Sequence, residues 1–242
     1  LLIALFLFSS NFFAQSDNED YTLEEIIVTA QKTEKSLQDV PIAVSALSAD
    51  DLALRQAVRF TDLQLNVPNL SYSETNFGGS SVSIRGIGRL ATGISFDQSV
   101  TTHINESPWG ENTNVATMFD MDRVEVLRGP QGTLFGRGTT AGLVNLVTKR
   151  PSVDSGVEGY AGFTTGEYDL QVFEGAVNIP LDDNFAVRAA YTQTERDGFT
   201  ENLYAPVGGT FDGREHYVGR ISLRYDTGNT VIDYMYQEHE EE

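Results

Sequence analysis

Few residues in this sequence have the type and spacing that catalysis or ligand binding would need, and the most suggestive of them are glycines. Residues Gly136 to Ala141 read GRGTTA, which fits the G-x-G-x-x-A fingerprint of dinucleotide-binding folds. That fingerprint needs the glycine turn to open a helix inside a βαβ unit, so that the helix N-terminus faces the phosphates. Here the glycines precede Leu143–Thr148, whose valines and threonine predict a strand instead. We therefore expect no nucleotide cofactor.

Metal and nucleophile chemistry are poorly supported as well. The three histidines, His103, His216 and His239, are widely spaced, and none has a second ligand at the i, i+4 spacing of a helical metal site. Serine, histidine and acidic residues all occur, but no serine lies in a nucleophile-elbow context. We expect no metal site, no cofactor and no enzyme activity.

Composition narrows the classes of partner. The chain has 242 residues, a formal net charge of −19 and no cysteine. Nucleic-acid binding needs clustered Lys and Arg side chains that neutralise phosphates, so this acidity argues against a nucleic-acid partner. The absence of cysteine is compatible with passage through an oxidising periplasm without a disulfide framework.

The first residues have the pattern of a secretory signal. Leu1–Phe8 is apolar but shorter than the about 20 residues that cross a bilayer as a helix, and polar residues follow it. We interpret residues 1–14 as a signal peptide, truncated at its start and cut after Ala14, with a buried strand or helix as the alternative. No later segment has the length and apolarity of a helical span, so membrane insertion would require a β-barrel.

Residues 31–151 carry the signals of a compact α/β region. Two Ser or Thr residues are followed three positions later by an acidic or amide side chain, which predicts helix starts. They are Ser48 with Asp51, for a helix over Ala49–Ala57, and Thr61 with Gln64, for a helix that ends before Pro68. Short β-branched runs predict a small mixed sheet with strands at Leu70–Ser73, Ser81–Ile87, Val100–Asn105, Val124–Leu127 and Leu143–Thr148.

From Gly156 onward the pattern changes to alternating strands rich in aromatic residues. Near residue 220, Ile221 and Leu223 fall on one face of a strand, while Arg220 and Ser222 fall on the other. An apolar outside and a polar inside at period two is the signature of a transmembrane β-barrel, with a soluble β-sandwich as the alternative. Short links after the second and fourth strands, and a long polar link after the third, fit the two ends of such a barrel. The predicted strands are Val157–Thr165, Asp169–Ile179, Asn184–Glu195, His216–Tyr225 and Thr230–Gln237.

Two separated stretches resemble one family. The first is Met121–Pro151, MDRVEVLRGPQGTLFGRGTTAGLVNLVTKRP, which closely resembles the end of the plug domain of TonB-dependent outer-membrane receptors. The second is Leu23–Leu52, LEEIIVTAQKTEKSLQDVPIAVSALSADDL, which resembles the TonB box and plug entry of that family. The resemblance implies an α+β plug domain, a small mixed sheet with short helices, followed by the first strands of an antiparallel transmembrane β-barrel, incomplete in this chain. The implied domains are a signal peptide (1–14), a flexible lead with the TonB box (15–30), the plug (31–151) and about five barrel strands (152–242).

The resemblance implies energised uptake of a scarce solute across the outer membrane of a Gram-negative cell, with the plug and TonB box facing the periplasm. An iron–siderophore complex is the expected cargo, and cobalamin, haem or an oligosaccharide are alternatives. The expected partners are TonB with its inner-membrane complex, a ferric chelate as ligand, and outer-membrane lipid. A soluble periplasmic plug-like interaction protein is the rival from another class.

The segment expected to contact TonB is EEIIVTA. Its composition alone fits an ordinary edge strand, but its place between the signal and a folded domain favours the TonB box of the family. An extended segment with unpaired backbone groups can add itself as a strand to a partner's sheet. Its residues are Glu24, Glu25, Ile26, Ile27, Val28, Thr29 and Ala30.

Two further sets of residues follow from the resemblance. Arg85 in SIRG and Arg128 in LRGP end plug strands beside glycines, and each is a candidate to pair with a glutamate of the barrel wall; a local salt bridge within the plug is the alternative. Candidate ligand contacts at the plug apex are Asn76, Phe77 and Trp109, although Trp109 is also suited to anchor its own loop. The Tyr-Val-Asp-Gly-like strand end of the family is replaced by THINE at 102–106, so the following turn differs from the family pattern.

Overall fold

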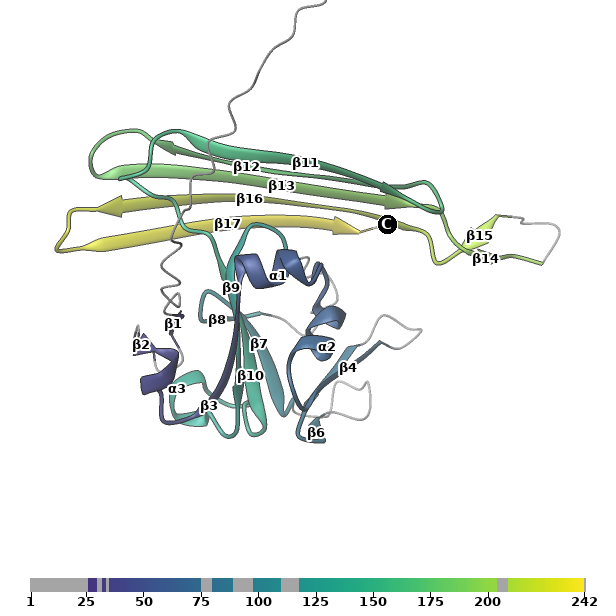
Figure 1. The fold of residues 1–242 in the computed structure, drawn as a ribbon, viewed down its shortest axis with the longest axis horizontal. Helices are drawn as coiled ribbons and strands as arrows, with labels where there is room; N and C mark the ends of the chain where they lie inside the picture. Colours follow the sequence, from purple (N-terminus) through teal and green to yellow (C-terminus); the bar gives the residue numbers. More distant parts are fainter. Residues whose placement is uncertain are drawn as a thin grey trace, which may run out of the picture.

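The computed structural model describes residues 26–29, 32–33, 35–74, 80–88, 98–109, 118–203 and 209–241. The chain forms two packed parts: a plug (residues 26–151) of short strands and helices, and a wall sheet (residues 158–241) of long strands that lies across it (Figure 1). In the described part of the chain, no helix is long and apolar enough to cross a membrane.

The centre of the plug is a five-stranded sheet in the order β3-β9-β10-β7-β8. Strand β10 is its middle strand, pairs parallel with β7 and antiparallel with β9, and has every side chain buried. A buried central strand reads as a nearly continuous apolar run, which is what its sequence GLVNLVT shows apart from one asparagine. The bounds are β3 (Ala43–Ser48), β7 (Val100–Ile104), β8 (Ser107–Pro108), β9 (Met121–Arg128) and β10 (Gly142–Thr148).

The sheet of the plug departs from the sequence prediction in three ways. The run Ser81–Ile87, predicted as one strand, is broken at Arg85 and Gly86, whose positive φ values turn the chain back on itself. Strand β3 was not predicted, because its residues AVSALS are small and alternate only weakly in polarity. The strands near residues 70–88 do not join the main sheet but form a separate three-stranded sheet in the order β4-β5-β6. The bounds are β4 (Leu70–Glu74), β5 (Ser80–Ile84) and β6 (Ile87–Gly88).

The helices are short. Helix α1 (Ala49–Leu54) begins at the predicted cap, where Ser48 and Asp51 bond each other's backbone N–H as a capping box, but it ends three residues earlier than predicted. The second prediction was wrong about its cap: Asp62, rather than Thr61, accepts the free backbone N–H groups at this helix start. The chain there forms η2 (Phe60–Asp62) and α2 (Leu63–Asn66), which ends before Pro68 as predicted. The remaining helices are η1 (Leu37–Asp39) and α3 (Gly132–Phe135).

The wall sheet is an antiparallel meander in the order β11-β12-β13-β16-β17, and all five predicted strands are confirmed. The links after β12 and β16 are short, while the long link after β13 carries a small hairpin, β14 (Thr200–Glu201) with β15 (Thr210–Phe211). The strand bounds are β11 (Glu158–Gly166), β12 (Leu170–Pro180), β13 (Phe185–Arg196), β16 (Arg214–Asp226) and β17 (Val231–Glu241).

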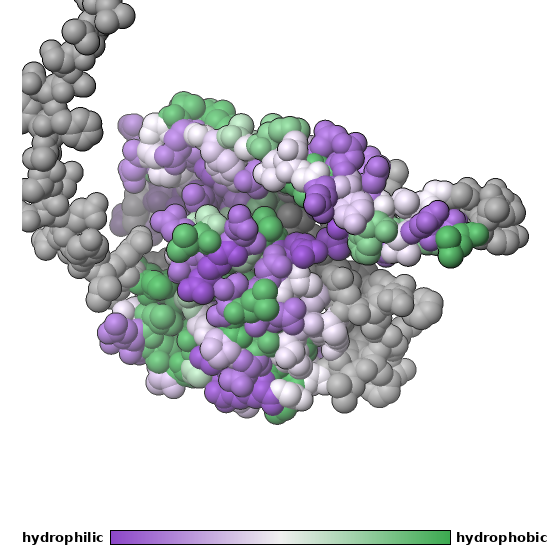
Figure 2. Space-filling view, turned by 45° about the vertical axis from the view of Figure 1, so that its right-hand side comes forward, coloured by the Kyte–Doolittle hydropathy of each residue, from purple (hydrophilic) through white to green (hydrophobic). Residues whose placement is uncertain are grey.

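The two faces of the wall sheet differ as the alternation predicts. Arg220 and Ser222 are buried against the plug, whereas Ile221, between them, is 51% exposed on the outer face. Phe173 and Tyr225 are also exposed there, and hydrophobic side chains line the top of the sheet in Figure 2, away from the plug. Polar groups therefore gather where the plug covers the sheet, and apolar side chains gather on the opposite face.

Gly142 is the glycine whose replacement should harm the plug most. Its φ of +150° is unfavourable for other residues, and an added Cβ would lie 2.1 Å from the carbonyl oxygen of Leu127 on the paired strand β9. We predict that Gly142→Ala destabilises the folded protein by about 2–4 kcal/mol, from backbone strain and the clash together. Thermal unfolding of the purified protein measures the effect. Gly132→Ala is the matched control, because nothing lies within 4 Å of its added Cβ; equal melting temperatures for the two variants would contradict the prediction.

Candidate functional site

The segment predicted to contact TonB is docked on the plug. Strand β1 (Ile27–Val28) pairs antiparallel with β2 (Lys35–Ser36), and the backbone N–H of Leu37 donates to the carbonyl oxygen of Ile26 at 2.9 Å. The Val28 side chain is fully buried in a cluster with Val40, Leu127 and Leu143, whereas Ile27 is 49% exposed. The segment thus uses one side chain as an apolar anchor and leaves its neighbour facing outward.

A buried carboxylate fixes the end of this segment. Glu125 on β9 has no exposed surface, and its carboxylate accepts the backbone N–H of Thr29 at 2.8 Å and the Thr29 hydroxyl at 3.2 Å. Arg123 donates from Nε at 2.8 Å and Asn145 from Nδ2 at 3.4 Å. A carboxylate can be buried only when donors replace its hydration in this way. Because Thr29 supplies two of these contacts, the docked segment is part of what stabilises Glu125.

Only part of the predicted segment can be placed. Glu24, Glu25 and Ala30 lie outside the described residues, so the structure describes Ile26 to Thr29 alone. These residues are extended, as predicted, but their backbone groups are paired within the chain instead of free.

A second feature joins the plug to the wall sheet through a buried ion pair. The carboxylate of Asp120, just before β9, accepts two hydrogen bonds from the Arg188 guanidinium on β13, one of them 2.8 Å from Nε. Arg220 on β16 stacks over the Phe119 ring at 4.5 Å and donates to the backbone carbonyls of Phe119 and Asp120 at 3.4 Å. The acid is therefore on the plug and the arginines are on the wall, which is the opposite polarity to the pairing expected for Arg85 and Arg128.

Some of the contacts between plug and wall follow one row of wall residues. Four wall residues lie side by side across β12, β13, β16 and β17, and we call them the contact row: Asn178, Arg188, Ser222 and Met235. Three of them bond the plug or the chain that leaves it: Asn178 to the backbone of Ser152, Arg188 to Asp120, and Met235 to the amide of Asn105. The first two contacts use polar donors and acceptors, so hydrogen bonds and charge help to hold the plug against the wall.

The remaining predicted residues lie apart from these contacts or beside them. Arg85 is exposed, and Arg128 is half-buried with its Nε unbonded; no carboxylate of the described residues pairs with either. Their pairing with barrel glutamates stays a prediction.

Trp109 follows β8, packs against the plug core and lies 6.3 Å, ring to ring, from His239 of β17. That position fits an anchor between plug and wall, and ligand contact by Trp109 stays a prediction. Asn76 and Phe77 lie outside the described residues.

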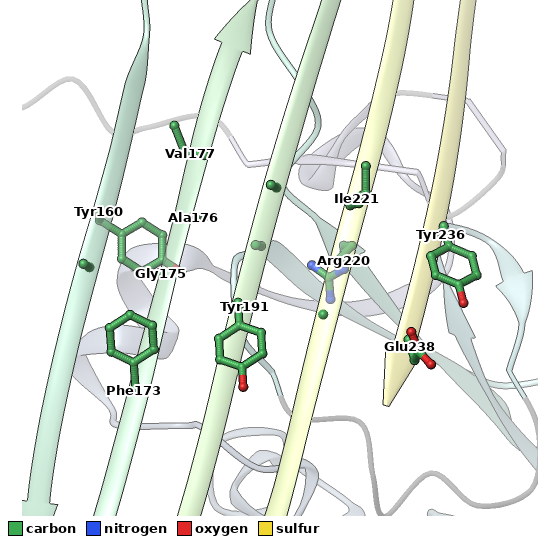
Figure 3. Close-up of a pocket in the computed structure, with 14 residues that line it drawn as sticks. Tyr160, Phe173, Gly175, Ala176, Val177, Tyr191, Arg220, Ile221, Tyr236 and Glu238 are labelled. Carbon is green, nitrogen blue, oxygen red and sulfur yellow. The ribbon is translucent and has the colours of Figure 1, made fainter. Parts of the chain in front are cut away.

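A hollow of about 500 Å³ on the wall sheet is separate from this site (Figure 3). Its lining includes Gly175, Ala189 and Gly219, which leave room beside the neighbouring rings of Phe173 and Tyr191, on the face turned away from the plug. Its exposed lining is mostly apolar, with Glu238 among the few charged residues that border it. Within the described residues, no group of three or more His, Cys, Asp and Glu side chains is placed to hold a metal ion.

Comparison with known proteins agrees with this architecture. Residues 36–143 match the TonB-dependent Receptor Plug Domain family. The iron-regulated outer membrane virulence protein of Vibrio cholerae is 30% identical over 202 residues, which cover 79% of this chain and 30% of that protein. The vitamin B12 transporter BtuB of Vibrio vulnificus is 25% identical over 229 residues, which cover 89% and 37%. The crystal structure of the ferric yersiniabactin uptake receptor FyuA from Yersinia pestis superposes with a TM-score of 0.74 at 23% identity, over 82% of this chain and 31% of that one.

The fold and these matches define a plug domain followed by strands of an outer-membrane β-barrel. The chain belongs to the TonB-dependent outer-membrane receptors, and the resemblance drawn from its sequence is confirmed. It spans about a third of the length of the curated relatives it matches.

Sequence reasoning missed the residues that carry the polar contacts. Glu125 and Asn145 are single polar residues inside otherwise apolar runs, VEVL on β9 and GLVNLVT on β10. That isolation is the available signal, because a lone polar residue in a buried strand must have a partner. Arg220 was assigned correctly to the inner face, but Asp120 gives no comparable signal in the sequence.

The buried ion pair yields a test of plug retention. Asp120→Ala leaves the Arg188 guanidinium buried without its carboxylate, a change that typically costs about 3–5 kcal/mol. We predict a loosened plug and faster entry of small solutes or large antibiotics into cells that express the complete receptor. Asp182→Ala is the control, because Asp182 caps an exposed turn of the wall sheet. Solute entry unchanged from wild type would show that the pair does not retain the plug.

His103 yields a pH dependence. Its ring is buried in the plug with Nε2 3.1 Å from the Thr101 hydroxyl and Nδ1 3.0 Å from the carbonyl oxygen of Glu106. Burial lowers the pKa of His103 below its usual 6.5, with the Glu106 carbonyl opposing that shift. Between this lowered pKa and 6.5 the unfolded chain binds more protons than the native one, so stability falls as the pH falls through that window. We predict a lower melting temperature at pH 5.5 than at pH 7.5, with a smaller difference in His103→Gln; an equal difference in that variant would contradict the prediction.

Proposed function

We propose that the protein takes up a scarce solute across the outer membrane with energy supplied through TonB, and that its cargo is a ferric chelate of the siderophore type. The observation that carries the proposal is the docked segment Ile26–Thr29, held by one short strand pair, one buried valine and one carboxylate. Such a grip is small enough to be released. The freed segment then presents extended backbone to a partner's sheet edge.

The route of force follows from the same contacts. TonB, reached from the periplasm, pairs with the released segment and pulls on the plug, and the polar contacts with the wall yield in turn. These contacts suit a plug that must stay closed and yet move, because a hydrogen-bonded interface can exchange its partners for water. The protein has no covalent chemistry to perform in this proposal.

We propose the cargo from what the names of the relatives say they take up. The Vibrio cholerae relative is described as iron-regulated, and FyuA takes up ferric yersiniabactin. Cobalamin is the second candidate, because BtuB of Vibrio vulnificus is described as a vitamin B12 transporter and is 25% identical over most of this chain.

Two substitutions at one position test the role of the segment. Ile27→Pro removes a backbone N–H from the segment, whereas Ile27→Ala keeps it and shortens a half-exposed side chain. We predict that Ile27→Pro in the complete receptor abolishes uptake while cargo binding stays within about twofold, and that Ile27→Ala transports nearly as wild type. Transport by Ile27→Pro at the wild-type rate would remove the basis of the proposal.

The same strains identify the cargo. A receptor-deletion strain carrying the complete gene, or the Ile27→Pro gene, is grown on a panel of ferric chelates, haem and cobalamin as sole sources. The proposal is supported if the complete gene allows growth on a ferric chelate and the Ile27→Pro gene does not. Growth only on cobalamin or haem would contradict the ferric chelate and leave energised transport in place.

A further inference from the structure

One buried amide contacts two parts of the plug. The first is the Glu125 carboxylate that holds Thr29, which we call the clasp, and the second is the turn between β7 and β8. Asn145 lies in the middle of β10 with 1% of its surface exposed. Its Nδ2 donates to Oε2 of Glu125 at 3.4 Å, and its Oδ1 accepts the backbone N–H of Glu106 at 3.0 Å. Because both ends of this amide are bonded, a movement at one end changes the bond available at the other.

The turn that Asn145 holds is the two-residue loop of the hairpin formed by β7 and β8. Asn105 and Glu106, between β7 and β8, have φ values of +48° and +67°, although neither is glycine. Positive φ at both positions is the pattern of a tight two-residue hairpin turn, which asparagine adopts readily and glutamate adopts less readily. Here the Asn105 amide is bonded to the backbone N–H and hydroxyl of Thr148, and the Glu106 carbonyl lies 3.0 Å from His103 Nδ1.

The same turn touches the barrel wall. The Asn105 amide lies 3.4 Å from the Met235 sulfur on β17, and Trp109, just after the turn, packs beside His239 of the same strand. A displacement of β17 relative to the plug therefore acts on residues 105–109, as it does on Arg150, which pairs with Asp233 of the same strand at 3.7 Å. If the turn relaxes its left-handed residues, the N–H of Glu106 turns away from Asn145.

Taken together, these contacts form one hydrogen-bonded path from the wall to the docked segment. We propose that Asn145 is a positioning residue that couples the β7–β8 turn to the clasp, so that relaxation of the turn weakens the hold of Glu125 on Thr29. Such coupling requires a second conformation of the turn, in which Glu106 leaves the left-handed region where it now lies at φ +67°. The meaning of this coupling for transport rests on the proposed function, whereas the coupling itself exists with or without TonB.

The first experiment measures docking directly. A spin label is attached to Ile27→Cys in the complete receptor, without cargo or TonB, and its mobile fraction is read by electron paramagnetic resonance. Asn145→Leu keeps a side chain of similar size but removes both amide contacts. It should raise the ratio of free to docked segment about tenfold, within the range common for coupled sites, although Asn145 makes no described hydrogen bond to residues 26–29. Thr139→Val is the matched control, a buried plug residue whose hydroxyl bonds Gly136 outside the path.

The second experiment uses reciprocity, which a merely structural role would not produce. Coupling must act equally in both directions, so Glu125→Gln should raise the mobility of a label on Ser107→Cys in β8, with the melting temperature of each variant as a check on folding. The proposal is overturned if the Ile27 label stays docked in a folded Asn145→Leu receptor. It is also overturned if the Ser107 label keeps its wild-type mobility in Glu125→Gln. Equal release by Thr139→Val also overturns it, since general loosening would then explain the result. Failure here leaves uptake dependent on Ile27, so it is distinguishable from failure of the proposed function.

Discussion

The structure depends on one constraint: polar groups of the wall sheet are covered by the plug and must find partners there. Arg188 and Arg220 keep only 6% and 3% of their surfaces exposed, so each needs acceptors that replace water. Asp120 supplies the carboxylate for Arg188, and the carbonyls and ring beside it receive Arg220. These contacts fix the position of the plug, because displacing it would leave two buried guanidinium groups without acceptors.

The apolar part of the same interface is small by comparison. Phe119 packs against Ala176, Ala190 and Val218, two of which present only a methyl group. Large interlocking apolar side chains would hold the plug more permanently, since burial of apolar surface is non-directional and is lost only when the surfaces separate. Directional polar contacts instead fix one position of the plug against the wall. The docked segment repeats this arrangement on a smaller scale, with Val28 as its apolar part and Glu125 as its polar part.

The sequence predicted the wall sheet almost completely, because strict alternation over long strands is a strong and local signal. Its inner and outer faces followed from the same alternation, as Arg220 and Ile221 show. The plug was predicted less well: β3 is too weakly patterned to recognise, and the division of its strands into two sheets depends on long-range packing. The polar partners were missed for the same reason. Asp120 and Arg188 are 68 residues apart, and Thr29 and Glu125 are 96 apart, so no local pattern links them.

Strand β9 has a mechanical consequence that follows from its position. Asp120, fixed to the wall, and Glu125, bonded to the docked segment, are five residues apart, a span of about 17 Å in an extended strand. The strand between them is bonded to β3 on one side and β10 on the other, so tension along its axis must shear many hydrogen bonds at once. The β1–β2 pair has only two residues in each strand and can open one bond at a time. A pull on the chain before β1 therefore opens the β1–β2 pair before it shears β9 from its neighbours.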